Sequence, residues 1–360
     1  MRHTTRTRAA HAHVPQDVVL ASGCSGALDL AISALVNAGD TLLVPCPGFP
    51  LYTTLCESRG IRLAPYKLDP GKDWEVDLVD FARVLEATRD APRRAVLLNN
   101  PSNPCGSVWS HTHTRAVMAA VEAARLPVIA DEIYWHLSFP SSAEPALPAA
   151  AATTAVPVLT VGGTAKEFMV PGWRLGWVAL HDRQGVLREV WKGIHALTQL
   201  VMGSNTLVQS VLPALLTPER GSAVEAALTA WKAGTLAKLE EHANYCVARL
   251  RACSISSSST DAGAHLVVIQ PRGAMYVMFR VPADGQGVRD DLLFAQQLLE
   301  QQNVFVLPGR AFFCPGFCRV VITPPMEMLA LAFDRIERFV RGITVQATAQ
   351  VGGASASGPS

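Results

Sequence analysis

A strand-like run that ends in two glycines and a lysine limits most strongly what this chain can fold into. Residues 158–161, V-L-T-V, are typical of a buried strand, and Gly162 and Gly163 permit a tight turn directly after it. Lys166 follows in a segment that is otherwise mostly apolar. Because a buried ammonium is costly and condensation with a carbonyl removes that cost, the segment predicts a lysine that forms a Schiff base. A surface lysine that snorkels along its alkyl stem is the alternative for this residue alone.

Arg174 lies eight residues after this lysine. The helix-breaking pair Pro171 and Gly172 stands between them, so Arg174 is expected on a separate segment that can fold back beside Lys166. A guanidinium beside a Schiff-base lysine suggests an anionic cofactor, pyridoxal phosphate. An ordinary buried arginine is the alternative interpretation.

A glycine-rich turn near the start of the chain has the pattern of an anion-binding site. Residues 17–21 predict a short strand, S-G-C-S-G follows, and residues 27–38 predict a helix. In such a unit the free backbone N–H groups and the positive end of the helix face one point, to which Ser25 can add a hydroxyl. The pattern is weak on its own, because any turn between a strand and a helix can carry glycines.

Polar residues follow two further predicted strands. Residues 127–130 run into Asp131, and the carboxyl ends of buried parallel strands are where open α/β sheets bind ligands. Glu132 points the other way along the strand and is interpreted as a structural hydrogen-bonding group. Residues 95–98 run into N-N-P-S-N-P-C-G, a rigid turn that presents amides in fixed directions. A purely structural turn is the competing interpretation, and it suits Asn99 or Asn100 better than Asn103.

Two other residues are unusual for their surroundings. Arg319 stands in F-C-R-V-V-I-T, a strand that is otherwise without charge. A lone buried arginine needs an anionic partner, and a carboxylate is the best geometric match. Phe49 lies on a turn between prolines, where a ring that stacks on a ligand and a ring that caps the core are about equally compatible with the sequence.

The segment G-G-T-A-K-E-F-M-V-P-G-W-R-L-G-W resembles the cofactor-lysine segment of the fold-type I aminotransferases of class I/II, and most closely that of the tyrosine aminotransferases. The resemblance continues from about residue 17 to about residue 342. It implies an α/β fold whose large domain holds a mostly parallel seven-stranded sheet between helices, with a smaller α+β domain at the C-terminal side. It also implies pyridoxal 5'-phosphate as cofactor and a homodimer with the site at its interface.

The resemblance also implies a role for each candidate residue. Lys166 holds the cofactor and moves the proton, Asp131 pairs with the pyridine nitrogen, and Tyr134 donates to the ring oxygen. Arg319, with Asn103, binds the substrate α-carboxylate. The remaining cofactor contacts are the phosphate-binding residues Cys24, Ser25, Gly26 and Arg174, the stacking ring of Phe49, and Asn103 at the phenolic oxygen.

The expected reaction is transamination of an aromatic L-amino acid, with tyrosine favoured, to a 2-oxo acid such as 2-oxoglutarate. Residues 193–216 contain no Lys, Arg, Asp or Glu, so they offer no guanidinium for a side-chain carboxylate and are expected to form a buried inter-domain helix. A lyase or synthase of the same fold is one alternative. A truncated relative of low activity that acts as a non-catalytic protein is the other.

The expected organisation has four parts: a disordered extension over residues 1–16, a large cofactor-binding domain over 17–218, a small domain over 219–343, and a disordered tail over 344–360. Residues 138–155 are expected to form a surface loop.

The resemblance implies a family segment before residue 17 that carries a tyrosine to the partner subunit's phosphate. The first tyrosine here is Tyr52, so weaker cofactor retention and dimerisation are expected.

Charge and cysteine usage exclude several classes of protein. The formal net charge is +1, which gives no electrostatic footprint for nucleic acid, and no apolar run reaches the roughly 20 residues of a membrane span. The eight cysteines are scattered without zinc-site spacing, so we expect no metal site and a reduced, cytoplasmic protein. Residues 1–16 are basic and lack acids, which leaves a mitochondrial location as the weaker alternative.

Overall fold

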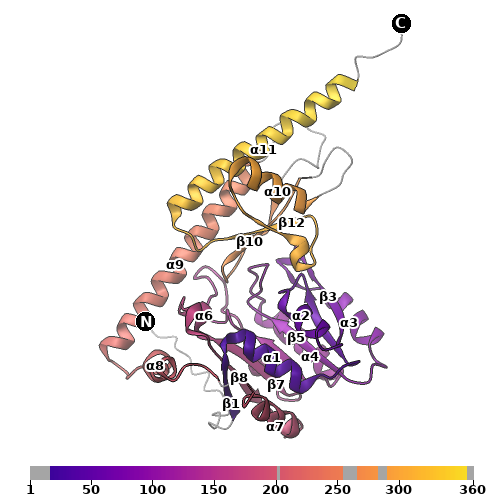
Figure 1. Ribbon diagram of the computed structural model, residues 1–360, viewed down its shortest axis with the longest axis vertical. Helices are drawn as coiled ribbons and strands as arrows, with labels where there is room; N and C mark the ends of the chain where they lie inside the picture. The colour runs from indigo at the N-terminus through magenta and orange to yellow at the C-terminus, as the bar shows by residue number, and fades with distance from the viewer. Residues whose placement is uncertain (1–16, 201–202, 254–265, 283–289, 355–360) are drawn as a thin grey trace.

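The computed structural model describes residues 17–200, 203–253, 266–282 and 290–354, with side chains as far as residue 342. A large α/β domain lies below a smaller domain in the view of Figure 1, and the two meet along the upper edge of the large sheet. The predicted extension, residues 1–16, lies outside the described residues. Within the described residues, no helix is both long and apolar enough to cross a membrane.

The large domain is built on one mixed sheet with the strand order β1-β8-β7-β6-β5-β2-β3-β4. Its strands are β1 (Val18–Ser22), β2 (Thr41–Cys46), β3 (Arg62–Asp69), β4 (Glu75–Val76), β5 (Arg94–Asn99), β6 (Val128–Asp131), β7 (Val158–Gly163) and β8 (Leu175–His181). Strands β3, β2, β5, β6 and β7 are parallel, whereas β8 runs antiparallel to both β7 and β1. The fold class is therefore confirmed, and the eighth strand is the two-residue edge strand β4.

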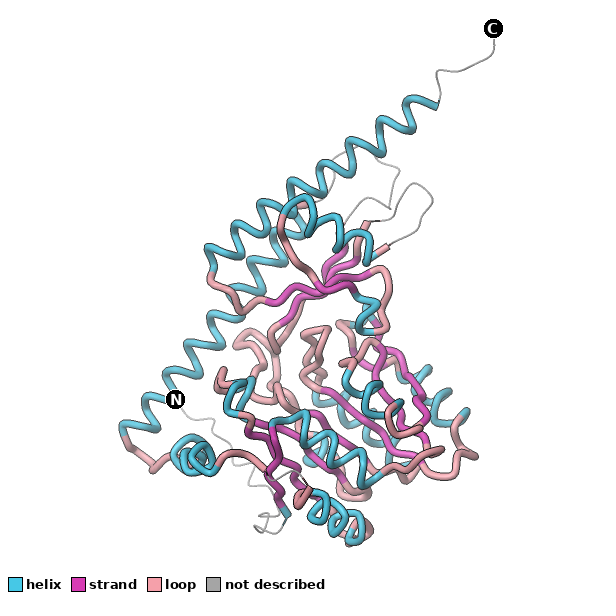
Figure 2. Tube along the Cα trace, viewed as in Figure 1, coloured by secondary structure: helices cyan, strands magenta, loops and turns pink. Residues whose placement is uncertain are grey.

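Helices cover the large sheet, as Figure 2 shows. The helices of this domain are α1 (Gly23–Leu35), α2 (Leu51–Glu57), α3 (Leu78–Ala87), α4 (His111–Ala123), α5 (Ala149–Ala152), α6 (Thr164–Glu167), α7 (Arg188–Leu197) and α8 (Thr206–Leu216), of which α8 lies to one side, near the start of α9 (Figure 1). The central strands are buried on both faces, which explains their continuous apolar sequence. One core joins the sheet to α1, α2 and α7, and the other joins its opposite face to α3 and α4.

The small domain packs an antiparallel sheet of order β11-β12-β10-β9 against long helices. Its elements are α9 (Ala223–Ala252), β9 (Val267–Val268), β10 (Tyr276–Arg280), α10 (Asp291–Gln302), β11 (Leu307–Pro308), the 3-10 helix η4 (Gly309–Phe312), β12 (Phe317–Val321) and α11 (Met326–Ala354). In Figure 1, α9 begins beside the large domain and rises into the small one, where it packs beside α11. Helix α11 continues beyond residue 343, where the disordered tail was expected to begin.

The expectation of a buried inter-domain helix over residues 193–216 is wrong. The chain forms the end of α7 and then α8, which has no buried residue, and the side chain of Leu207 is 78% exposed. The segment is apolar as expected, but within the described part of the chain no element covers α8. Burial depends on a partner surface, which the composition of a helix does not reveal.

The expected surface loop over residues 138–155 is also more ordered than its composition suggests. It contains α5, and Phe139 and Ala146 are buried. Ser138 forms an isolated β-bridge to Gly273 of the small domain. Short alanine and proline runs are thus held here by contacts with other elements.

Candidate functional site

The carboxyl ends of β5, β6 and β7 bring the predicted residues to one edge of the sheet. The register pairs Asn99 with Asp131 and Asp131 with Val161, so these strands end side by side. Lys166 lies in α6, which begins directly after β7. Gly163 allows the chain to approach β8 closely at this point, because it has no side chain. A Cβ there would lie only 2.7 Å from the Leu175 carbonyl oxygen and would clash with it.

Asp131 is a buried carboxylate held by three donors. The Tyr52 hydroxyl donates to Oδ2 at 2.7 Å, the Ile133 backbone N–H donates to Oδ1 at 3.3 Å, and the Cys24 thiol lies 3.6 Å from Oδ1. Burial raises the pKa of Asp131, while these hydrogen bonds and the charge of Lys166 lower it. Among the described residues it has no salt-bridge partner, so a protonated ring nitrogen would complete the site.

Lys166 lies close to these groups without being neutralised by them. Its Nζ is 5.7 Å from the centre of the Tyr134 ring, and no described carboxylate is within ion-pair distance of it. The adjacent Glu167 binds Lys232 of α9 instead, at 2.6 Å, while Phe168 stacks on Trp231. The Lys166 amine is therefore available for condensation with a carbonyl.

Arg174 folds back onto the start of α1. Its Nη2 lies 3.3 Å from the Ser22 carbonyl oxygen, and its guanidinium covers the face of Gly23. Ser22 makes no side-chain cap, and the first turn of α1 carries no acid. The first-turn N–H groups of Cys24 and Ser25 have no intrahelical partner, which leaves them for an anion at the start of α1, together with the exposed Arg174.

Arg319 projects from β12 of the small domain and is only 9% exposed. Its Nη1 donates to Oδ1 of Asn103 at 2.7 Å, but its buried Nε has no partner among the described residues. Burial lowers the pKa of Arg319, although an arginine stays charged. A guanidinium with an unused N–H in a buried site fits a carboxylate ligand.

The other predicted residues also lie near this site. Tyr134 is buried, and its hydroxyl is 2.6 Å from that of Tyr276. Phe49 is half-buried and meets the ring of Tyr52 edge-on, with centres 5.7 Å apart. Asn99 and Asn100 hold the turn, because they accept from the backbone N–H groups of Asn103 and Trp109 respectively.

Comparison with known proteins identifies the group to which this arrangement belongs. Residues 2–336 match the family model described as aminotransferase class I and II. The chain belongs to the class I and II aminotransferases. This family and its fold depend on pyridoxal phosphate.

Individual relatives agree with this family. A tyrosine aminotransferase of Dictyostelium discoideum is 38% identical over 90% of this chain and 73% of its own length, and one of Caenorhabditis elegans is 40% identical over 90% and 64%. The crystal structure of tyrosine aminotransferase from Leishmania infantum has a TM-score of 0.78 and 34% identity, covering 91% of this chain and 74% of that one. This aminotransferase thus spans about two thirds to three quarters of the length of these relatives.

The residues present fit pyridoxal phosphate at each of its functional groups. The start of α1 with Arg174 suits the phosphate, Asp131 suits the ring nitrogen, and the amine of Lys166 suits the carbonyl carbon. Among the described residues, no salt bridge occupies Lys166, Asp131 or Arg174, so each of the three remains available to the cofactor.

Replacing Gly23 by alanine should weaken the binding of pyridoxal phosphate by at least about tenfold. Gly23 has φ +70°, and a Cβ there would lie 2.5 Å from Nη2 of Arg174. The methyl group would displace the guanidinium of Arg174 from the phosphate-binding position, and the loss of a hydrogen bond to a charged group, about 1.5–3 kcal/mol, corresponds to about tenfold or more in affinity. Titration of the apoprotein with pyridoxal phosphate measures this change. Gly172→Ala is the matched control, since no atom lies within 4 Å of a Cβ at that position, and equal losses in both variants would contradict the proposed phosphate site.

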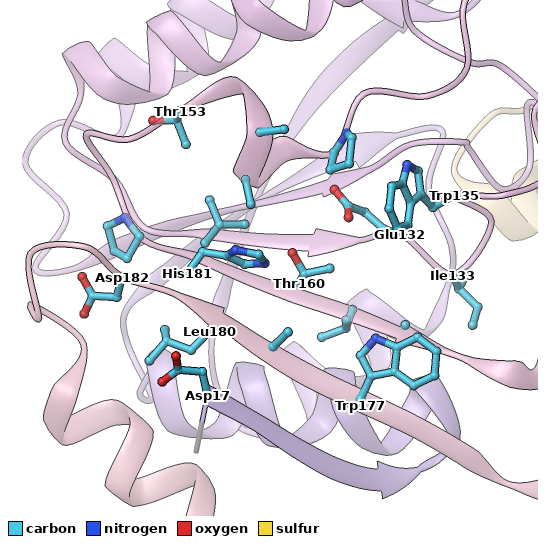
Figure 3. Close-up of a pocket in the computed structure, with 18 of the residues that line it drawn as sticks. Asp17, Glu132, Ile133, Trp135, Thr153, Thr160, Trp177, Leu180, His181 and Asp182 are labelled. Carbon is cyan, nitrogen blue, oxygen red and sulfur yellow. The ribbon is translucent and has the colours of Figure 1, made fainter. Parts of the chain in front are cut away.

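A separate cavity of about 1020 Å³ lies on the face of the sheet opposite α1 (Figure 3). Thr160, Trp177 and Glu132 line it, whereas Lys166 and Arg319 do not. The Ala149 N–H donates to Oε1 of Glu132 at 2.7 Å, which confirms that Glu132 is a structural hydrogen-bonding group. Burial raises the pKa of Glu132 to about 7.

Three residues that contact the predicted site residues were not themselves predicted to belong to the site. Tyr52, Tyr276 and Phe312 contact Asp131, Tyr134 and Arg319 respectively. Tyr52 follows Phe49 by three residues on a helical turn, so its position on the same side was a usable signal. Tyr276 and Phe312 approach from the small domain, and nothing in their own segments indicates which large-domain residues they meet.

Proposed function

We propose that this aminotransferase moves the amino group of an aromatic L-amino acid, with tyrosine favoured, to a 2-oxo acid such as 2-oxoglutarate. The observation that carries the proposal is the convergence of Lys166, Asp131 and Arg319, which joins an amine, a buried carboxylate and a carboxylate-binding guanidinium. The names of the most similar relatives support tyrosine as the amino donor.

Each residue has a chemical task in this proposal. Pyridoxal phosphate, when bound, supplies an electron sink for the bond to the substrate α-carbon. Lys166 would take the proton from the substrate α-carbon as a general base and deliver it, as a general acid, to C4′ of the cofactor. Asp131 places a negative charge where the ring nitrogen carries its proton, and Tyr134 donates to the phenolic oxygen.

The remaining residues bind and orient the two molecules. Arg319 binds the α-carboxylate of the substrate. Asn103 accepts from Arg319 with its oxygen, which leaves its amide N–H to donate to the cofactor's phenolic oxygen. Cys24, Ser25, Gly26 and Arg174 would hold the phosphate, and the ring of Phe49 would stack on the face of the cofactor.

The kcat/KM for tyrosine should exceed that for aspartate by at least about tenfold. The relatives carry this expectation, because their names are those of tyrosine aminotransferases. Steady-state kinetics with both donors and 2-oxoglutarate measure the ratio, and the products should be the aromatic oxo acid and glutamate. An aspartate value equal to or above that of tyrosine would contradict the proposed substrate. Loss of the amino group as ammonia without glutamate would instead identify a lyase.

We propose further that the chain works as a homodimer. Helix α8 supports this, because it is apolar and has no buried residue in the described structure. Such a surface is typical of a protein interface.

Leu207→Glu should therefore weaken the dimer. The side chain is 78% exposed on α8, and a charge in an interface must be desolvated. Light scattering should give the wild type the mass of two 38.5 kDa chains and should give the variant a dissociation constant raised by at least about tenfold. Val79→Glu on α3, where the side chain is 82% exposed, is the control and should stay dimeric. A wild type that remains monomeric at micromolar concentration would exclude the proposal.

A cytoplasmic location is proposed on cysteine chemistry alone. All eight cysteines lie among the described residues, and each is a free thiol. Unpaired thiols are typical of proteins that work in a reducing compartment.

A further inference from the structure

The guanidinium of Arg319 lies between two aromatic rings of the small domain. Its Cζ is 4.2 Å from the centre of the Tyr276 ring and 4.5 Å from that of Phe312. Tyr276 comes from β10, where Met278 pairs with Arg319, so Tyr276 is its diagonal neighbour across the sheet. Two rings fix the plane of a guanidinium and leave its edge free for a carboxylate.

Tyr276 makes a second contact that reaches into the large domain. Its hydroxyl oxygen is 2.6 Å from that of Tyr134, and the two rings meet edge-on at 79°. Both side chains are nearly excluded from water, with 6% and 2% exposure. The contact is therefore a short hydrogen bond that joins the two domains within the site.

The phenol of Tyr134 keeps its proton. Burial raises the pKa of Tyr134 well above its ordinary value, and proximity to Tyr276 and Asp131 raises it further, while Arg319 opposes the shift. Lys166 is the other charged group beside the Tyr134 ring. One hydroxyl of this pair donates to the other, so the proton of the accepting hydroxyl is free to point elsewhere.

We propose that Tyr276 is a positioning residue with two separable tasks: its ring orients Arg319 for the substrate carboxylate, and its hydroxyl donates to Tyr134 so that Tyr134 donates to the cofactor. The proposal rests on the assignment of Tyr134 to the phenolic oxygen of pyridoxal phosphate. That oxygen is an acceptor, so both hydroxyls are satisfied only when the donors run from Tyr276 to Tyr134 to the cofactor. A hydroxyl that accepts a hydrogen bond is also a stronger donor.

Tyr276→Phe tests the hydroxyl while keeping the ring against Arg319. Without the hydrogen bond from Tyr276, Tyr134 is a weaker donor, so the phenolic oxygen of the cofactor keeps more negative charge. That charge stabilises the protonated form of the lysine–cofactor linkage, and the linkage therefore loses its proton at a higher pH. The midpoint of the pH-dependent change in visible absorption should rise by about 0.4–1 unit, from the ordinary net worth of one hydrogen bond. The titration uses the protein loaded with pyridoxal phosphate and no amino acid.

Phe312→Leu is the matched control, because it removes the other ring from Arg319 and no hydroxyl. This variant should raise KM for both the amino acid and the oxo acid several-fold and leave the absorption midpoint in place. Tyr276→Leu should show both effects together. An unmoved midpoint in Tyr276→Phe, or an equal shift in Phe312→Leu, would overturn the proposal. Because the midpoint is read without turnover, a wrong choice of tyrosine as substrate would leave this test intact.

Discussion

Lys166→Ala should lower the rate of transamination by at least about 10⁴-fold. A positioned general base contributes up to about this factor, and the same amine also holds the cofactor, so both contributions are lost together. Its Nζ has no described ion-pair partner, and therefore no salt bridge is broken by the change. Single-turnover absorbance with tyrosine measures the rate, and the variant should also lack the absorption of a lysine-linked cofactor.

Lys232→Ala is the control for this variant. Lys232 lies one residue from the ring that stacks on Phe168, and it pairs with Glu167 rather than with the site. We expect its loss to change the rate by less than about tenfold, since a partly exposed ion pair contributes little. Borohydride reduction followed by peptide mapping should place the label on Lys166. A label on Lys232 or any other lysine would refute the assignment.

Arg319→Ala should reduce kcat/KM for every amino-acid and oxo-acid substrate by a similar factor. Truncating one partner of a desolvated charge pair costs about 2–5 kcal/mol, which corresponds to about 30- to 5,000-fold. All of these substrates share the α-carboxylate, so the loss should not depend on the side chain. The measurement compares at least one aromatic and one aliphatic donor.

Arg319→Lys separates charge from geometry in the same position. The lysine keeps the positive charge but cannot present two parallel N–H groups between the rings of Tyr276 and Phe312. We expect an activity between those of the wild type and the alanine variant. A defect in Arg319→Ala that is confined to one substrate would mean that the guanidinium binds a side chain instead of the common carboxylate.

The sequence predicted best those features that depend on neighbouring residues. Strand β6 (Val128–Asp131) lies within one residue of the predicted strand 127–130, because its continuous apolar sequence is buried on both faces of the sheet. The turn from β7 to α6 was likewise predicted from the glycines before Lys166. Local chemistry determines such elements whatever the rest of the chain does.

Pairings between distant residues could not be predicted in this way. Tyr52 meets Asp131 from 79 positions away, and Tyr134 meets Tyr276 from 142. Each residue type indicates a need for a partner, but the choice among several buried tyrosines is made by the packing of two domains. The exposure of α8 was missed for a related reason, because an apolar helix shows that it needs a covering surface and not whether this chain provides it.

Helix α9 connects the two domains as one continuous rod. Trp231 and Lys232, near one end, are bound to the residues that follow Lys166, and Leu250, near the other end, lies in the small-domain core. At 1.5 Å per residue, Lys232 and Leu250 are about 27 Å apart along the axis. A rotation of this rod by only about 5° about either end would displace the other by about 2.4 Å. The same helix therefore connects the core of the domain that carries Arg319 to the segment that follows Lys166.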